Sequence, residues 1–145
     1  MTNYATSAAL LDDIERIVVG SVAVTAQALN DAHPELTLSQ WRVLVLVDQP
    51  DGMAVGAIAK SLGAKIAAVS RLVGRLRERG LIQTHRSDVD ARLVLVSLTA
   101  SGRRLRHRIV DSRRAVLTAM LKETGLTSDM KPAVEQLAAL LGATE

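Results

Sequence analysis

Residues 54–80 read AVGAIAKSLGAKIAAVSRLVGRLRERG, residues 81–102 read LIQTHRSDVDARLVLVSLTASG, and together they decide the fold. Two short helical patterns meet at Leu62-Gly63, and the second pattern ends at Gly80. Glycine is the residue expected where a helix closes in a left-handed turn. Two apolar strands then flank a polar tip. Two helices, a tight turn and a basic hairpin predict a winged helix-turn-helix, a mainly α fold with a small β-hairpin wing.

The periodicity of the apolar residues places these elements. The first helix is predicted over residues 55–61, with Ile58, Ala59 and Leu62 pointing inward. The second is predicted over residues 64–79, where the spacing i, i+3, i+4 and i+7 is occupied by Val69, Leu72, Val73 and Leu76. The strands are predicted over residues 81–86 and 92–98. Thr99 is the expected N-cap of a long helix over residues 100–123.

Another helix precedes this stretch and has a clear start. Thr37-Leu38-Ser39-Gln40 is a capping box, with Thr37 as N-cap and Gln40 as the third helical residue. Leu36 and Trp41 flank the cap and predict a hydrophobic staple. We expect the inward side chains to be those of Trp41, Leu44, Val45 and Val47. Pro50-Asp51-Gly52 is expected to end the helix.

The charge of the chain is unevenly distributed. The 145 residues carry a net charge of +3, but residues 60–114 hold 14 Lys and Arg against 4 Asp and Glu, a net +10, and the remainder carries −7. A basic middle between acidic ends suits contact with DNA phosphates through the middle alone. The chain has one Tyr, one Trp and no Phe, so it lacks the aromatic platforms on which single-stranded bases stack. Double-stranded DNA is the expected partner.

The helix predicted over residues 64–79 is about 24 Å long, so only its N-terminal half fits a major groove. Arg71 suits a guanine edge or a phosphate, and Ile66 and the alanines suit thymine methyls. Ser39 and Gln40, in the first turn of the preceding helix, either attract phosphate through backbone N–H groups or only cap their helix. On the helix predicted over residues 64–79, which would be the recognition helix, the candidate DNA-binding residues are Lys65, Ile66, Ala67, Ala68, Ser70, Arg71 and Arg75. The alternative is that this face is merely solvated.

The hairpin tip is the second candidate site for DNA. Arg92 lies where a wing reaches the minor groove, and Arg86 flanks the same tip. Asp90, two residues before Arg92, is expected to hold the Arg92 guanidinium in one rotamer, because a preorganised arginine suits a narrow and electronegative groove. The alternative is an exposed cross-strand pair that contributes little.

The two ends of the chain are mostly apolar helices, predicted over residues 6–29 and 128–141. One small core cannot absorb both apolar stripes, so we expect a homodimer. The residues expected to hold it are Leu10, Leu11, Ile14, Val134, Leu137 and Leu141. A two-fold dimer also places two reading helices about one turn of DNA apart.

Several classes of function are disfavoured. The chain contains no cysteine, which excludes disulfides, thiol redox sensing and thiolate metal sites. His33, His85 and His107 are isolated in sequence, so we expect no zinc site and no cofactor. Neither a signal peptide nor an apolar run of membrane-spanning length is visible, and we expect a cytoplasmic protein. No nucleophile–base set and no phosphate-binding glycine loop is visible, so we do not expect an enzyme.

Several motifs occur in helix order along the whole chain. They are Leu38-Ser39-Gln40-Trp41-Arg42-Val43-Leu44, Ser70-Arg71-Leu72-Val73 with Leu76, Arg79-Gly80-Leu81-Ile82, and Asp90-Ala91-Arg92 followed by Ser97-Leu98-Thr99 and Gly102. Together they resemble the multiple antibiotic resistance regulator (MarR) family. The resemblance implies one domain over residues 1–145, with dimerisation helices over about 1–30 and 100–145 and a DNA-binding lobe over about 37–99.

The same resemblance implies a function. It predicts an obligate homodimer on a pseudo-palindromic operator, usually a repressor of an adjacent operon. A small aromatic or phenolic effector, held between the dimerisation helices and the DNA-binding lobe, would release it; no motif marks the pocket. One stretch departs from the family, because residues 64–68 read AKIAA where small polar residues are frequent. The alternative is therefore an architectural DNA-binding protein without ligand control.

Overall fold

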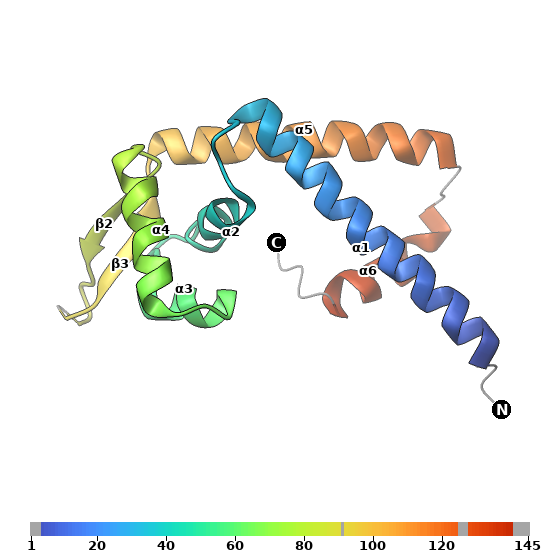
Figure 1. Cartoon of the computed structure of the whole chain (residues 1–145), viewed down its shortest axis with the longest axis horizontal. Helices are drawn as coiled ribbons and strands as arrows, with labels where there is room; N and C mark the ends of the chain where they lie inside the picture. Colours follow the sequence, from blue (N-terminus) through green and yellow to red (C-terminus); the bar gives the residue numbers. More distant parts are fainter. Residues whose placement is uncertain (1–3, 91, 125–127, 141–145) are drawn as a thin grey trace. The chain divides into compact units, whose positions relative to one another are not determined.

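The computed structural model describes residues 4–90, 92–124 and 128–140. It confirms a mainly helical chain with one small antiparallel sheet (Figure 1). Two compact units are present, residues 1–113 and 114–145, and their boundary falls within α5. The elements in chain order are α1 (Tyr4–Ala32), α2 (Leu38–Leu46), β1 (Met53–Ala54), α3 (Val55–Leu62), α4 (Ile66–Glu78), β2 (Ile82–Arg86), β3 (Val94–Leu98), α5 (Ala100–Thr124), the 3-10 turn η1 (Ser128–Met130) and α6 (Lys131–Leu140).

The capping box at the start of α2 is confirmed. The Gln40 N–H donates to Thr37 Oγ1 at 3.2 Å, and the Thr37 N–H donates to Gln40 Oε1 at 3.0 Å. Leu36 and Trp41 are both buried in the core, as a hydrophobic staple requires. The entry of the chain into α2 is thus fixed by local chemistry.

The prediction that Val45 points inward is wrong. Val45 is exposed, whereas Val43, which the prediction omitted, is fully buried. At 100° per residue, the buried arc of α2 runs from Val43 through Val47, Gln40 and Leu44 to Trp41. Val45 lies just beyond the Trp41 edge of that arc, so its side chain reaches solvent.

The turn between α3 and α4 is closed by glycine, as the sequence predicts. Gly63 has a φ of 61°, in the left-handed region. The Gly63 N–H donates to the Lys60 carbonyl at 3.2 Å, and the Ala64 N–H donates to the Ala59 carbonyl at 2.9 Å, which together form a Schellman motif. Helix α4 begins at Ile66 rather than Ala64. Ile58 and Val69 are fully buried and join the two helices in the core.

The sheet has three strands in the order β1-β3-β2, all antiparallel. Strand β1 is not predicted from the sequence, because two residues are too few to show a period of two. In the hairpin, Ile82 pairs with Leu98 and Thr84 with Val96, and this face turns into the core. Side chains alternate along a strand, so the opposite face carries the pairs Gln83 with Ser97 and His85 with Leu95.

The start of α5 is tied to the turn between α4 and β2. Thr99 caps α5, because its Oγ1 accepts from the Gly102 N–H at 3.0 Å. The Thr99 hydroxyl also donates to the Gly80 carbonyl at 2.6 Å, and the Thr99 N–H donates to the Leu81 carbonyl at 3.1 Å. One threonine therefore fixes both the helix start and its position against the turn between α4 and β2.

Each unit exposes apolar side chains on its terminal helices. On α1, Ala28 and Leu29 are buried in the core, but the preceding turns expose a stripe of Leu10, Leu11, Ile17, Val18, Val19 and Val22, with Ile14 half-buried. In the second unit, Val134 is exposed and Leu137 half-buried. Leu141 lies outside the described residues. Within the described ranges, no helix has both the length and the apolar character that crossing a membrane requires.

Candidate nucleic-acid interface

The N-terminal half of α4 presents an exposed face beside the hairpin of β2 and β3 (Figure 1). Ala68 is half-buried, and the other candidate residues of this helix are exposed, namely Lys65, Ile66, Ala67, Ser70, Arg71 and Arg75. Ile66 stands out, since a large apolar side chain at the helix start is 60% exposed. Its exposure leaves it free to contact an apolar group of a partner.

The start of α4 has no side-chain cap. Its N-cap residue, Lys65, has extended backbone and makes no capping hydrogen bond. The hydroxyl of Ser70 donates back to the Ile66 carbonyl at 2.9 Å, so its proton is already committed. Uncapped N–H groups at a helix start attract anions, because the helix dipole adds to their partial charge. The start of α4 therefore presents the exposed alkyl side chains of Ile66 and Ala67 and a helix end that attracts anions. Arg71 and Arg75 are exposed on the same helix.

Helix α2 offers less than the sequence analysis allowed. Gln40 is only 3% exposed, and both its N–H and its Oε1 are occupied by the capping box. Gln40 thus caps its helix, and its contact with phosphate stays a prediction. Ser39 is exposed, and its role stays a prediction.

The hairpin tip is held by local hydrogen bonds. The Ser87 N–H donates to the Leu93 carbonyl at 3.0 Å, and the Leu93 N–H donates to the Asp90 carbonyl at 2.9 Å. The Ser87 hydroxyl oxygen accepts from the Val89 N–H at 3.2 Å. Arg86 and Arg92 are both exposed on this tip. Exposed arginines therefore extend from a tip whose described residues are joined by local hydrogen bonds.

The expected role of Asp90 is wrong in its detail. Asp90 Oδ1 accepts a hydrogen bond from the backbone N–H of Arg92 at 2.9 Å. Within the part of the chain that the structure describes, no ion pair joins Asp90 to the Arg92 guanidinium. A short Asp side chain reaches the backbone N–H two residues ahead more readily than it reaches the end of a long arginine. Asp90 thus fixes the backbone that carries Arg92, not the arginine rotamer.

Sequence reasoning missed the polar contacts that join the first half of α5 to the rest of the unit of residues 1–113. Arg106 and Asp48 form an ion pair at 3.1 Å, and both side chains are about three-quarters buried. Arg103 donates to the Leu98 carbonyl at 3.0 Å. No motif marks these residues, because the partners come from elements far apart in sequence. Within the described ranges, no group of three His, Asp or Glu residues is arranged to hold a metal ion.

Comparison with known proteins identifies a similar family. The model of the MarR family matches residues 36–94, which run from the residue before the α2 N-cap to the first residue of β3. This part of the chain is similar to the MarR family. Proteins of this family are transcriptional regulators that bind DNA. The matched residues include α4, β2 and the hairpin tip, and end at the first residue of β3.

The curated relatives of this chain include a transcriptional repressor and a transcriptional activator. The organic hydroperoxide resistance transcriptional regulator of Bacillus subtilis is 29% identical over 106 residues, which cover 73% of this chain and 70% of the relative. The transcriptional repressor IacR of Pseudomonas putida is 28% identical, over 64% of this chain and 54% of the relative. The transcriptional activatory protein BadR of Rhodopseudomonas palustris is 35% identical, over 47% of this chain and 41% of the relative.

Solved structures support the fold. The RV1404 protein of Mycobacterium tuberculosis has a TM-score of 0.82 at 22% identity, with 100% of this chain and 97% of that chain covered. CouR of Rhodococcus jostii RHA1, solved with p-coumaroyl-CoA bound, has a TM-score of 0.71 at 25% identity, with 97% and 93% covered. The chain therefore shares its fold with these solved structures.

Proposed function

We propose that this protein is a homodimeric repressor of the MarR type that binds a pseudo-palindromic operator in double-stranded DNA and responds to a small effector. The observation that carries the proposal is the pairing, within one compact unit, of an exposed α4 start with a hydrogen-bonded basic wing. These are the two elements with which a winged helix-turn-helix reads the major and the minor groove.

Helix α4 reads the major groove in this proposal. Lys65 and Arg75 contact phosphates, and Arg71 contacts a guanine edge or a phosphate. Ile66, Ala67 and Ala68 contact thymine methyls, because they offer only alkyl surface. Ser70 acts as a hydrogen-bond acceptor, since its proton is given to the Ile66 carbonyl. Ser39 contacts phosphate from the first turn of α2. On the wing, Arg86 contacts phosphate and Arg92 enters the minor groove.

The experiment that tests the function is fluorescence anisotropy with the duplex upstream of the protein's own gene. A scrambled duplex of equal length is the comparison, both near physiological salt. A specific regulator binds the native duplex at least about 10³-fold more tightly. Equal binding of the native duplex and the scrambled one would contradict specific recognition there.

An architectural DNA-binding role is the second candidate. The observation in its favour is the start of α4, where residues 64–68 offer no hydroxyl or amide group and the Ser70 proton is already used. Phosphate contacts would then dominate, and affinity would fall steeply with salt for every sequence. Similar affinity for both duplexes with such a slope would support this role.

The effector is proposed to be a small molecule. CouR, at 25% identity, holds p-coumaroyl-CoA, which supports an aromatic acid or its ester as one class. Peroxide sensing through a thiol is not available, because the chain contains no cysteine. Candidate effectors can then be screened in the anisotropy assay for their ability to release the protein from DNA.

Arg92→Ala is expected to weaken operator binding by about 1–3 kcal/mol while the fold stays intact. Arg92 is exposed on the wing, so its removal leaves no core defect. Anisotropy measures the affinity, and Arg77→Ala, an exposed arginine on α4 outside the candidate set, is the control. Unchanged affinity in Arg92→Ala would remove the wing from the interface.

Asp90→Asn and Asp90→Ala are expected to differ in DNA affinity. Asparagine keeps an Oδ1 acceptor for the Arg92 N–H, so Asp90→Asn should bind at least as tightly as the wild type, and the loss of a negative charge favours DNA. Asp90→Ala removes the acceptor and should bind several-fold more weakly. If Asp90→Asn were as weak as Asp90→Ala, the carboxylate charge, and not the backbone contact, would be the important feature.

A further inference from the structure

The first half of α5 carries positive charges that the proposed DNA interface does not use. Arg103, Arg104 and Arg108 lie within two turns of this helix, and all three are exposed, as is His107 beside them. We call the three arginines the α5 cluster. None of them forms an ion pair with a carboxylate in the part of the chain that the structure describes, and Arg104 donates to the exposed hydroxyl of Ser101 at 2.9 Å. The α5 cluster therefore offers charge that the described chain does not neutralise.

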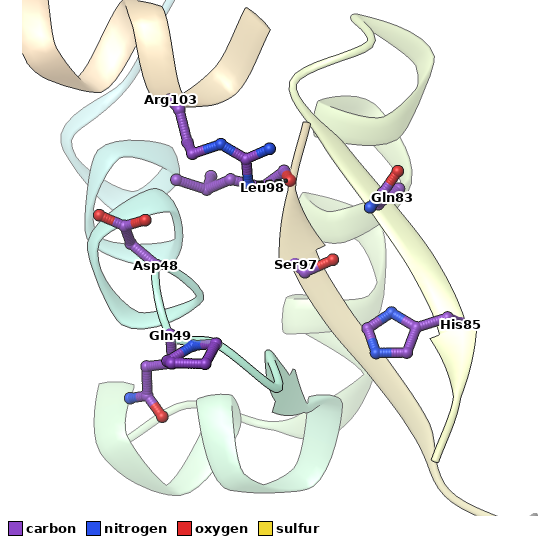
Figure 2. A pocket seen from close by; sticks show the side chains of 8 residues that line it. Asp48, Gln49, Gln83, His85, Ser97, Leu98 and Arg103 are labelled. Atoms are coloured by element: carbon purple, nitrogen blue, oxygen red, sulfur yellow. Dashed lines mark hydrogen bonds between the residues drawn. The ribbon is translucent and has the colours of Figure 1, made fainter. Parts of the chain in front are cut away.

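The carboxylate near the start of α5 is already paired. Asp48, at the end of α2, forms its ion pair with Arg106 at 3.1 Å. Arg103 donates through one nitrogen to the Leu98 carbonyl at 3.0 Å, and Figure 2 shows its guanidinium beside this end of β3. Asp48 is thus neutralised by a different arginine and does not offset the charge of the α5 cluster.

The position of the α5 cluster is unfavourable for the helix itself. Arg103 and Arg104 lie at the N-terminal end of α5, where the helix dipole is positive and repels cations. Arg104 and Arg108 are four residues apart, a spacing at which like charges destabilise a helix. No acidic residue occupies the first turn of α5 to offset them. Local rules of this kind are broken at functional sites, where binding outweighs a small loss of stability.

The chemistry of the α5 cluster favours the backbone of a nucleic acid. Arginine, and not lysine, occupies all three positions, and a guanidinium binds a phosphate through two parallel hydrogen bonds. Double-stranded DNA presents a dense row of phosphates, about one charge per 1.7 Å of its axis. Between Ala100 and Arg113 no large apolar side chain is exposed, so this surface lacks the residues that would insert into a lipid membrane.

The α5 cluster lies away from the elements proposed to hold the operator. The Thr99 hydroxyl donates to the Gly80 carbonyl, so α5 begins beside the C-terminal end of α4. The start of α4 lies at the far end of that 13-residue helix, roughly 20 Å away. Figure 1 shows, within residues 1–113, the hairpin tip and the start of α4 at the end opposite the first turns of α5. A straight duplex that lies across α4 and the tip therefore leaves the α5 cluster uncovered.

We propose that the α5 cluster binds the phosphate backbone of a second DNA duplex, without sequence preference, while α4 and the wing hold the operator. The arginines donate to phosphate oxygens, and their charge releases counterions from the duplex. The protein would in this way bridge two DNA segments. The inference rests on the proposed function for the occupant of α4 and the wing, whereas phosphate contact by the α5 cluster does not depend on the operator sequence.

Energy transfer between two fluorescent duplexes tests the bridge. The operator duplex, kept to the length of its two half-sites and saturated with the full-length protein, carries the donor, and a scrambled duplex of equal length carries the acceptor. The wild type should bring the two duplexes together. Arg104→Ala/Arg108→Ala should bind the scrambled duplex at least tenfold more weakly in this assay, with unchanged operator affinity. Its unfolding temperature should equal or exceed that of the wild type, because two unfavourably placed charges are removed.

Arg16→Ala/Lys122→Ala is the matched control, since it removes the same charge from exposed helix positions outside the α5 cluster. It should give the energy transfer of the wild type. Salt dependence supplies a second readout, because each lost phosphate contact lowers the slope of log affinity against log salt by about 0.9. The slope for the second duplex should therefore fall by about two in Arg104→Ala/Arg108→Ala, and the slope for the operator should stay the same.

Several outcomes would overturn the bridge. They are no energy transfer with the wild type, an unchanged affinity and salt slope in Arg104→Ala/Arg108→Ala, and an equal loss in the control variant. Displacement of the second duplex by polyglutamate as effectively as by DNA of equal charge would also overturn it, since the α5 cluster would then suit an acidic protein.

The failure of the proposed function gives a different result. In that case native and scrambled duplexes bind equally in the anisotropy assay. Energy transfer between two scrambled duplexes, and its loss in Arg104→Ala/Arg108→Ala, would then still support the α5 cluster as a DNA-binding surface, and the absence of transfer would contradict it. The two failures are therefore distinguishable.

Discussion

Gly102→Ala is expected to lower the free energy of unfolding by about 3 kcal/mol, at the upper end of the usual cost of overpacking. Gly102 is buried at the start of α5, and a Cβ there would overlap the Leu81 carbonyl oxygen and lie 3.2 Å from Leu98 Cδ2. The oxygen belongs to backbone that Thr99 also holds by a hydrogen bond. A backbone group so fixed cannot move aside as a flexible side chain does.

Gly74→Ala is the matched control, because Gly74 is also a helical glycine. Its Cβ would meet nothing within 4 Å. Alanine is the better helix former by about 0.5–1 kcal/mol, so Gly74→Ala should be slightly more stable than the wild type. Urea unfolding of the three proteins measures the difference. Gly102→Ala with wild-type stability would show that α5 can shift away from Leu81 at little cost.

The elements that sequence predicted well are those with local signals. The capping box at Thr37, the left-handed glycines Gly63 and Gly80, and the apolar period of α4 each act within one or two turns of chain. The exposure of the α4 start follows from the same period, which is why most of the candidate DNA residues are exposed as expected. Their contact with DNA stays a prediction.

The features that sequence missed depend on distant partners or on small geometric differences. Strand β1 exists because Met53 and Ala54 meet β3, some forty residues later in the chain. The sequence does not show whether the Asp90 carboxylate accepts from the backbone N–H of Arg92 or from its guanidinium. The structure shows the backbone N–H. Ser97 reads as an ordinary strand residue, and only the packing of α2, α5 and the sheet encloses it. Such facts follow from tertiary structure, which no local pattern carries.

Leu11→Asp is expected to convert the dimer to a monomer and to lower operator affinity at least about 10²-fold, because a dimer gains affinity by engaging two half-sites at once. Leu11 is 57% exposed in the single chain and lies in the apolar stripe of α1. A charge there leaves the core intact but would be buried, unpaired, in a dimer interface.

Asn30→Asp is the matched control, since it adds the same charge at an exposed polar position of the same helix. Sedimentation equilibrium should give twice the 15.5 kDa chain mass for the wild type and for Asn30→Asp, and the single-chain mass for Leu11→Asp. Circular dichroism checks that all three are folded. Val134→Asp tests α6 in the same way, because Val134 is 58% exposed. If Leu11→Asp stayed dimeric and bound the operator like the wild type, the apolar stripe of α1 would lie outside the interface. The partner surface would then have to be sought on the second unit.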